Sequence, residues 1–267
     1  MRIAALVVAL ALTACLPAGA RAQSADAAPT PVPIEEWSQA KVVAMGKEIF
    51  RQDTAAWQGT DALIAFLNGA QPTGLKGWIV EPAGNDQRVR FLIVDEAGTR
   101  AGWDVIVSER GAGAVTVPAD GTLTAEELAR FQARRTAMDN IGRLRCSRNL
   151  NTAVVDDPDS DGWLVWLLTS TTDANIVPMG GHYRFRISAD GLSVLQRDML
   201  TNGCLNMPRA QPGAQGAPVG LWVSQIVSHG PVETHVFLSL QNRMPIYVAA
   251  GDKLFEVNGV HIREVRR

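Results

Sequence analysis

Three aspartates at alternate positions form the sharpest chemical motif in the chain. They are Asp157, Asp159 and Asp161 in the segment DPDSDG at 157–162. Calcium suits such a set, because its large coordination sphere takes several hard oxygen ligands and the glycine permits a tight turn. An EF-hand loop would need glutamate where this chain has Leu168. The motif therefore admits a calcium-stabilised turn outside the EF-hand class. The competing and commoner interpretation is a solvated, empty hairpin turn.

Histidine and glutamate residues offer a second candidate site. Glu233 and His235 are two residues apart near the start of a predicted strand, so we expect them to share a face, with His229 just before them. Together with His182 they could form a His/His/Glu zinc or iron site with an open position for water. No H-E-x-x-H motif is present. Isolated histidines at strand ends are more often surface or satisfied polar groups, which is the competing interpretation.

Cys146 and Cys204 are the cysteines that remain in the body of the chain once an N-terminal leader is removed. They lack metal-type spacing, so in an exported protein they predict a disulfide. Such a bond would close a loop of about 58 residues and stabilise the fold by about 4 kcal/mol. The alternative is a Cys204 nucleophile served by His182. No local signature supports it, and an oxidising compartment would consume the thiol.

Six arginines follow one another between residues 130 and 148, and they could dock phosphate, anionic lipid or an acidic polymer. Acidic residues dilute the patch, notably Glu126, Glu127 and Asp139, so we expect a solvated helix face. The arginines are Arg130, Arg134, Arg135, Arg143, Arg145 and Arg148.

A predicted β-hairpin over residues 182–200 positions His182. Apolar and basic residues alternate from 182 to 187, which places an apolar row on one face and a His/Arg row on the other. Residues 188–191 read Ser-Ala-Asp-Gly, which is typical of a hairpin turn. We expect the apolar row to face the core and the basic row to face solvent.

The remaining pattern predicts an α+β fold: N-terminal helices and a short antiparallel sheet, then a predominantly antiparallel β half. A capping box at Thr124–Glu127 opens a helix to about Asn140. The apolar run Trp163–Leu168 predicts a central strand buried on both faces. In the first half we expect helices at 35–51 and 61–67 and strands at 77–81, 89–95 and 102–108. In the second half we expect strands at 152–155, 162–170, 182–188, 192–200, 219–227, 234–240, 245–248 and 254–257.

The N-terminus reads as a secretory signal peptide over residues 1–22. Arg2 precedes an apolar stretch too short to span a bilayer, and Ala20-Arg21-Ala22 gives a small-x-small cleavage pattern, with cleavage after Ala22. Residues 23–33 follow as a flexible lead-in. A competing lipoprotein box ends at Cys15, and a membrane partner is expected only if Cys15 is lipidated. We expect a helix plus three-strand unit at 34–142 and a β-rich unit at 143–267, which could share one sheet.

Composition excludes a nucleic-acid partner, because a formal charge of −2 gives no basic footprint. The chain has no glycine-rich phosphate loop, G-x-S-x-G elbow or C-x-x-C motif. The leading hypothesis is therefore an exported, bacterial-type periplasmic or secreted protein that acts as a non-catalytic binding or envelope-associated module. Calcium is the cofactor that the leading hypothesis allows, and the ligand and partner are unknown. The alternative is a metal-dependent hydrolase that uses His182, Glu233 and His235.

Overall fold

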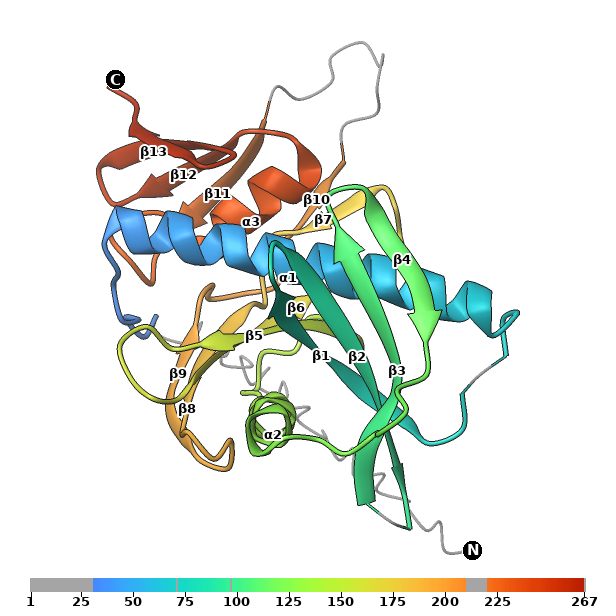
Figure 1. Cartoon of the computed structure of the whole chain (residues 1–267). Helices are drawn as coiled ribbons and strands as arrows, with labels where there is room; N and C mark the ends of the chain where they lie inside the picture. The colour runs from blue at the N-terminus through green and yellow to red at the C-terminus, as the bar shows by residue number, and fades with distance from the viewer. Residues whose placement is uncertain (1–30, 71, 97, 210–219, 267) are drawn as a thin grey trace, which may run out of the picture. The chain divides into compact units, whose positions relative to one another are not determined.

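The computed structural model describes residues 31–70, 72–96, 98–209 and 220–266. Pro31–Arg267 form one compact unit. Helices and antiparallel sheets are both present, which confirms the predicted α+β class (Figure 1). The predicted signal peptide, Cys15 and most of the predicted lead-in lie outside the described residues.

Helix α1 (Gln39–Phe66) is continuous, so the prediction of two separate helices was wrong. It crosses the unit between α3 and the first sheet (Figure 1). Small residues allow this passage: a β-carbon added at Gly46 would lie 2.5 Å from Val236 Cβ, and one at Gly59 would lie 3.0 Å from Val89 Cβ. The middle of α1 has the polar and small residues of a loop. It is helical because α1 packs closely on α3 and on the first sheet.

The first sheet is an antiparallel meander in the order β1-β2-β3-β4. Its strands are β1 (Leu75–Ala83), β2 (Asp86–Asp95), β3 (Gly98–Ser108) and β4 (Gly111–Thr116). Three of them were predicted, whereas β4 lies in a Gly/Ala-rich stretch that has little β propensity. The C-terminal half of α1 packs on this sheet through Ala55, Ala56 and Leu63.

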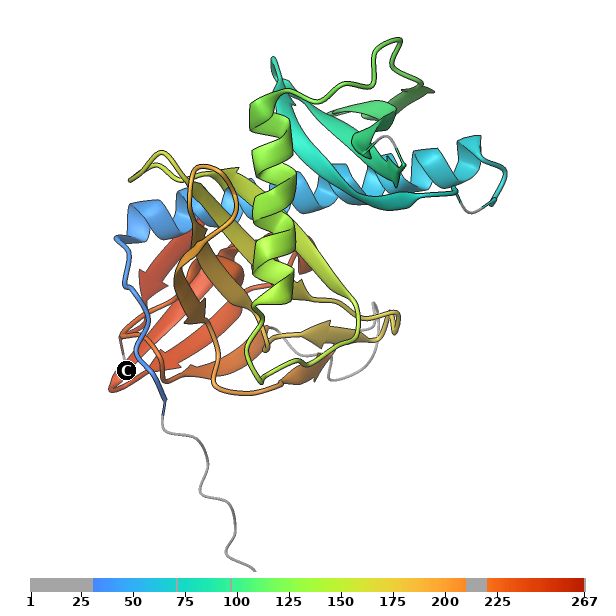
Figure 2. The ribbon, with the colours of Figure 1, turned by 90° about the horizontal axis from the view of Figure 1, so that it is seen from below.

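Helix α2 (Ala125–Asp139) begins at the predicted capping box. Thr124 Oγ1 accepts from the Glu127 amide over 3.1 Å, and Glu127 Oε2 accepts from the Thr124 amide over 2.8 Å. The helix lies between the first and second sheets (Figure 2). Arg130 is buried on it with its guanidinium 4.6 Å from the Trp163 ring centre, so the expectation of a solvated arginine face was wrong at this position.

The second sheet has the order β5-β6-β8-β9, with all neighbours antiparallel. Its strands are β5 (Leu150–Asp156), β6 (Trp163–Thr169), β8 (Tyr183–Ile187) and β9 (Val194–Met199). β6 is buried along its whole length and β8–β9 form the predicted hairpin. The basic face of β8 is also buried, contrary to expectation, because the segment before α1 and the start of α3 cover Arg184. A short pair, β7 (Ile176–Pro178) and β10 (Asn206–Pro208), lies beside this sheet.

The last sheet has the order β11-β12-β13-β14. Helix α3 (Glu233–Asn242) connects β11 to the parallel strand β12, so the strand predicted at 234–240 was wrong. This segment is buried on all sides from Glu233 to Ser239, and a short run without a polar face gives no periodicity to separate helix from strand. The strands are β11 (Leu221–Gln225), β12 (Ile246–Ala250), β13 (Lys253–Asn258) and β14 (His261–Glu264).

The Cys146–Cys204 disulfide is confirmed, with the two Cα atoms 5.4 Å apart. It ties the segment before β5 to the segment before β10. Gly181 lies against it with φ +80°, and a β-carbon there would lie 2.3 Å from Cys146 Sγ. The left-handed backbone and the lack of space both require glycine at this position.

Candidate functional site

The aspartates of the predicted calcium turn contact cations of the chain. Asp157 is buried and its carboxylate contacts Arg186, while the carboxylate of Asp159 contacts Lys41. The Lys41 ammonium holds the pKa of Asp159 below its ordinary value. Asp161 is exposed. Within the described residues, no group of three or more His, Cys, Asp or Glu side chains is placed to hold a metal ion.

The predicted histidine pair lies in the core. His182 Nδ1 accepts from the Thr169 amide over 3.1 Å, and its Nε2 lies 3.2 Å from the Pro178 carbonyl oxygen, where it donates as the protonated ring nitrogen. His235 Nδ1 accepts from the Val232 amide over 3.0 Å and so caps the start of α3. Burial lowers the pKa of His182 to about 4 and that of His235 to about 3. Both rings are therefore neutral at neutral pH.

Glu233, the third residue of the predicted hydrolase site, belongs to a buried ion cluster. Its Oε1 accepts from Trp166 Nε1 over 2.9 Å and from Arg184 Nη1 over 3.2 Å. Arg184 also donates through Nε to Asp198 over 3.1 Å, and its guanidinium lies 3.8 Å from the Trp37 ring centre. Solvent does not reach Glu233. The carboxylate of Glu233 is thus held by hydrogen bonds to Trp166 and Arg184.

His229 does not join these groups. It is 96% exposed in its side chain, and Nδ1 contacts Glu36 Oε1 at 2.6 Å. The structure therefore brings together the buried members of the predicted cluster but holds them in separate hydrogen bonds.

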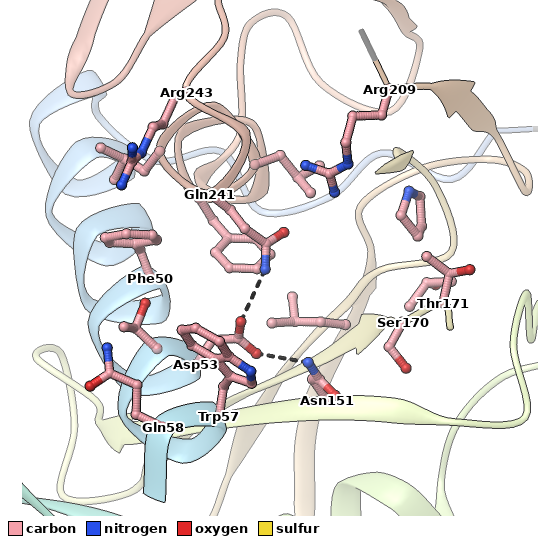
Figure 3. A pocket seen from close by; sticks show the side chains of 17 residues that line it. Phe50, Asp53, Trp57, Gln58, Asn151, Ser170, Thr171, Arg209, Gln241 and Arg243 are labelled. Carbon is pink, nitrogen blue, oxygen red and sulfur yellow. Dashed lines mark hydrogen bonds between the residues drawn. The ribbon is translucent and has the colours of Figure 1, made fainter. Parts of the chain in front are cut away.

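A different site lies between the middle of α1, α3 and the end of β6. It is a hollow of about 510 Å³ (Figure 3). This volume falls within the range of small-molecule sites in proteins. Polar and aromatic side chains together line it. They include Phe50, Asp53, Trp57, Asn151, Ser170, Thr171, Arg209, Gln241 and Arg243.

Among the described residues, Asp53 is the only acidic side chain that lines the hollow, and 8% of the residue is exposed. Asn151 Nδ2 donates to its Oδ1 over 2.9 Å, and Gln241 Nε2 donates to its Oδ2 over 3.1 Å (Figure 3). Burial raises the pKa of the Asp53 carboxyl, and the two amide hydrogen bonds oppose that rise. Two neutral amides thus orient a carboxylate that has lost much of its hydration.

Helix α1 presents Asp53 between two aromatic rings. Phe50, Asp53 and Trp57 recur at a spacing of three and four residues, which places them on one helix face. Trp57 is 61% exposed. The neighbouring residue Gln52 fixes this face, because its side-chain amide exchanges two hydrogen bonds with the backbone of Val154 on the edge strand β5, over 2.8 and 2.9 Å.

Two arginines complete the lining of the hollow. Arg209 donates through Nε to the Ala174 carbonyl over 2.9 Å. Arg243 ends α3 in the left-handed conformation with φ 52°. That position favours glycine, and an arginine there carries backbone strain of about 1–2 kcal/mol. Figure 3 shows Arg243 near Phe50 and Arg209 on the other side of Gln241, with Asp53 farther down the hollow.

Sequence reasoning missed this site entirely. A signal exists in the spacing of Phe50, Asp53 and Trp57, because an acid between two aromatic residues on one helix stripe is unusual for a packing face. The signal was hidden because Trp57 fell in a predicted loop between two helices. Asn151 and Gln241 come from distant segments, and their approach to Asp53 depends on the tertiary fold.

Comparison with known proteins adds no assignment. No model of a known protein family matches the chain, and no curated protein or solved structure shows significant similarity to it. Among the described residues, no helix combines the length and apolar character needed to cross a membrane.

Proposed function

We propose that the protein is an exported, non-catalytic binding module whose hollow takes a small polar organic molecule. One observation carries this proposal: a buried carboxylate, Asp53, lies beside the largely exposed ring of Trp57 in a hollow of about 510 Å³. The ring of Trp57 is apolar, yet most of it faces water instead of the core. A ligand in the hollow would cover this ring, so ligand contact is the role that we assign to it.

The polar groups of the hollow favour binding over catalysis. No His, Cys, Lys or Glu lines it within the described residues. Ser170 Oγ donates its proton to the Asn149 carbonyl over 2.9 Å, so this hydroxyl has no neighbouring base. Asp53 is already hydrogen-bonded on both oxygens. Within the described residues, this lining pairs no nucleophilic side chain with a general base, as covalent catalysis of hydrolysis would need.

Export is supported by the disulfide and by the leader-like N-terminus. A disulfide between Cys146 and Cys204 suits an oxidising compartment. The pattern at Ala20–Ala22 predicts a mature N-terminus at Gln23. Mass spectrometry of the mature protein tests this: an N-terminus at Gln23 supports soluble export, a lipid-modified Cys15 supports the anchored alternative, and an uncleaved chain from Met1 contradicts both.

Thermal unfolding tests the binding proposal. The mature protein is heated with each member of a panel of amino acids, betaines, hexoses and nucleosides at millimolar concentration. A ligand that binds only the folded state at a hundred times its Kd stabilises it by about 2.7 kcal/mol, which raises the midpoint. We expect at least one compound to do so with the wild type and not with Trp57→Ala. Trp222→Ala is the matched control, because Trp222 is also half-exposed but lies on β11, outside the hollow.

Two results would count against a binding role for the hollow. In the first, no compound of the panel raises the midpoint. In the second, a compound raises it equally in the wild type and in Trp57→Ala but not in Trp222→Ala, which would place the ligand on β11 instead.

A further inference from the structure

The charge of Asp53 has no partner within the described part of the chain. No lysine, arginine or histidine there lies within ion-pair distance of its carboxylate, and its only hydrogen bonds come from the neutral amides of Asn151 and Gln241. The other buried carboxylates described above, Asp157, Asp198 and Glu233, each contact an arginine. Asp53 differs from these three carboxylates because it borders the hollow instead of contacting an arginine.

The surroundings of Asp53 suit a cationic group. Phe50 and Trp57 lie on the same face of α1, one turn before and one turn after it (Figure 3). The face of an aromatic ring attracts an ammonium group, and a carboxylate beside it supplies the opposite charge. The Nδ2 and Nε2 bonds of Asn151 and Gln241 use one lone pair on each carboxylate oxygen, so each oxygen keeps a further acceptor site.

The two arginines suit an anionic group in the same ligand. Neither Arg209 nor Arg243 forms an ion pair with a carboxylate of the described residues, and both line the hollow. The hydrogen bond from Arg209 Nε to the Ala174 carbonyl orients the guanidinium group. The terminal Nη groups of Arg209 remain as donors for a ligand. Guanidinium groups bind carboxylates through paired hydrogen bonds. A hollow with one acidic and two basic side chains therefore matches a ligand that carries both charges.

We infer that the hollow binds a free amino acid or a closely similar zwitterion, with its ammonium group at Asp53 and its carboxylate at Arg209 and Arg243. This inference rests on the proposed binding function and names the ligand class. A hexose would hydrogen-bond to the amides and stack on Trp57, but it would leave the charges of Asp53, Arg209 and Arg243 without partners. The left-handed conformation of Arg243 fits this role. Glycine would avoid the backbone strain at this position but has no guanidinium group to bind a carboxylate.

Matched probes test the inference by isothermal titration calorimetry. The wild type is titrated with each of the twenty common amino acids and glycine betaine. The tightest binder is then compared with two truncated analogues: the amine that lacks its carboxylate and the acid that lacks its ammonium group. We expect each analogue to bind at least tenfold more weakly. Glucose and galactose are titrated in parallel, as neutral ligands of similar size.

Variants separate the two ends of the ligand. Asp53→Asn should weaken the amino acid at least tenfold while leaving the affinity for the analogue without an ammonium group almost unchanged. Arg209→Gln should weaken the amino acid while sparing the analogue without a carboxylate. Arg135→Gln on α2 is the control, since Arg135 is exposed and lies outside the hollow. Arg243→Gly should weaken the amino acid without lowering the unfolding midpoint, because glycine adopts the left-handed conformation freely.

The outcomes distinguish this inference from the function on which it rests. If no zwitterion binds but a hexose does, in a manner lost in Trp57→Ala, the hollow is a binding site and the inference is wrong. Binding of a zwitterion that Asp53→Asn leaves unchanged also overturns the inference. If neither zwitterions nor hexoses nor the wider panel bind, the proposed function itself fails.

Discussion

The side-chain amide of Asn151 donates a hydrogen bond to Asp53 Oδ1 over 2.9 Å, although 98 residues separate them in the chain. Asn151 lies near the start of the edge strand β5, and Asp53 lies in the middle of α1. The contact depends on Gln52, whose amide binds the backbone of Val154 on the same strand. The orientation of the Asp53 carboxylate is therefore set by how α1 docks on β5.

The Asp53→Asn variant is expected to be more stable than the wild type at pH 7. Burial raises the folded-state pKa of Asp53 above its unfolded value, so folding disfavours the charged form. The resulting loss of stability develops as the pH rises from the unfolded-state pKa to the folded-state pKa, and it is complete above the folded-state pKa. The neutral amide removes this penalty, and it keeps both hydrogen bonds when Asn151 or Gln241 turns its amide so that the oxygen accepts from the new NH2 group. Urea denaturation at pH 7 measures the free energy of unfolding of both proteins.

Asp159→Asn is the matched control for this variant. Lys41 and Arg186 lower the pKa of Asp159, so its charge stabilises the folded state above the unfolded pKa and the substitution should lower the free energy of unfolding. If Asp53→Asn also proves less stable than the wild type, the carboxylate of Asp53 stabilises the fold and the account of its uncompensated charge is wrong.

Acid should destabilise the protein through its buried histidines. His182 and His235 have folded-state pKa values of about 4 and about 3, against about 6.5 in the unfolded chain. Below pH 6.5 the unfolded state binds protons that the folded state does not, so stability falls as the pH falls. Each histidine contributes a slope of up to about 1.4 kcal/mol per pH unit. Urea denaturation between pH 7 and pH 5 should show this slope.

The histidine origin of that slope can be isolated by substitution. In His235→Gln the slope between pH 6.5 and pH 5 should fall by about half, because one of the two buried rings is gone. The exposed His261 on β14 serves as the control, and His261→Gln should keep the slope of the wild type. An unchanged slope in His235→Gln would show that another group titrates in this range.

The sequence was informative where a local pattern decides the structure. The capping box at Thr124–Glu127 and the turn at 188–191 form their hydrogen bonds with residues close in the sequence, and both were predicted correctly. The strand β6 was also predicted correctly, because its side chains are apolar on both faces and a surface strand would have one polar face. The cysteine count sufficed for the disulfide, because only two cysteines remained to be paired.

The pattern failed where distant segments cover a polar row. Arg184 read as solvent-facing because its alternation with apolar residues is that of an exposed strand face. Its burial depends on Asp198, Glu233 and the segment before α1, which no local pattern joins to it. The same limit hid the hollow, whose lining includes residues of α1, β5, β6, α3 and the segment after β10.

Glu233→Gln should destabilise the fold and should not alter metal content. Removing one partner from a buried ion cluster leaves Arg184 with less compensation, at a cost of about 3–5 kcal/mol. Urea denaturation should show this loss, while Glu264→Gln on the exposed face of β14 should show almost none. A stable Glu233→Gln variant that loses bound zinc relative to the wild type would instead support the hydrolase hypothesis.

Removal of divalent ions is expected to leave the unfolding midpoint unchanged. Arg186 and Lys41 already neutralise Asp157 and Asp159, so a calcium ion would have to displace both cations. The midpoint is measured in EDTA and then with calcium in excess. A rise with calcium that disappears in Asp159→Asn would show that the turn at 157–162 is an ion site after all.

The most direct test of the account is a ¹³C NMR titration of the Asp53 carboxyl carbon. The spectrum is assigned by comparison with Asp53→Asn and recorded with and without the tightest-binding amino acid. We predict that the pKa of Asp53 lies above its ordinary value in the free protein, because of burial, and falls when the ligand's ammonium group binds. The contrary result is a pKa at or below the ordinary value in the free protein that does not change when the ligand is added. It would contradict the claim that Asp53 is a buried carboxylate whose cationic partner is the ligand.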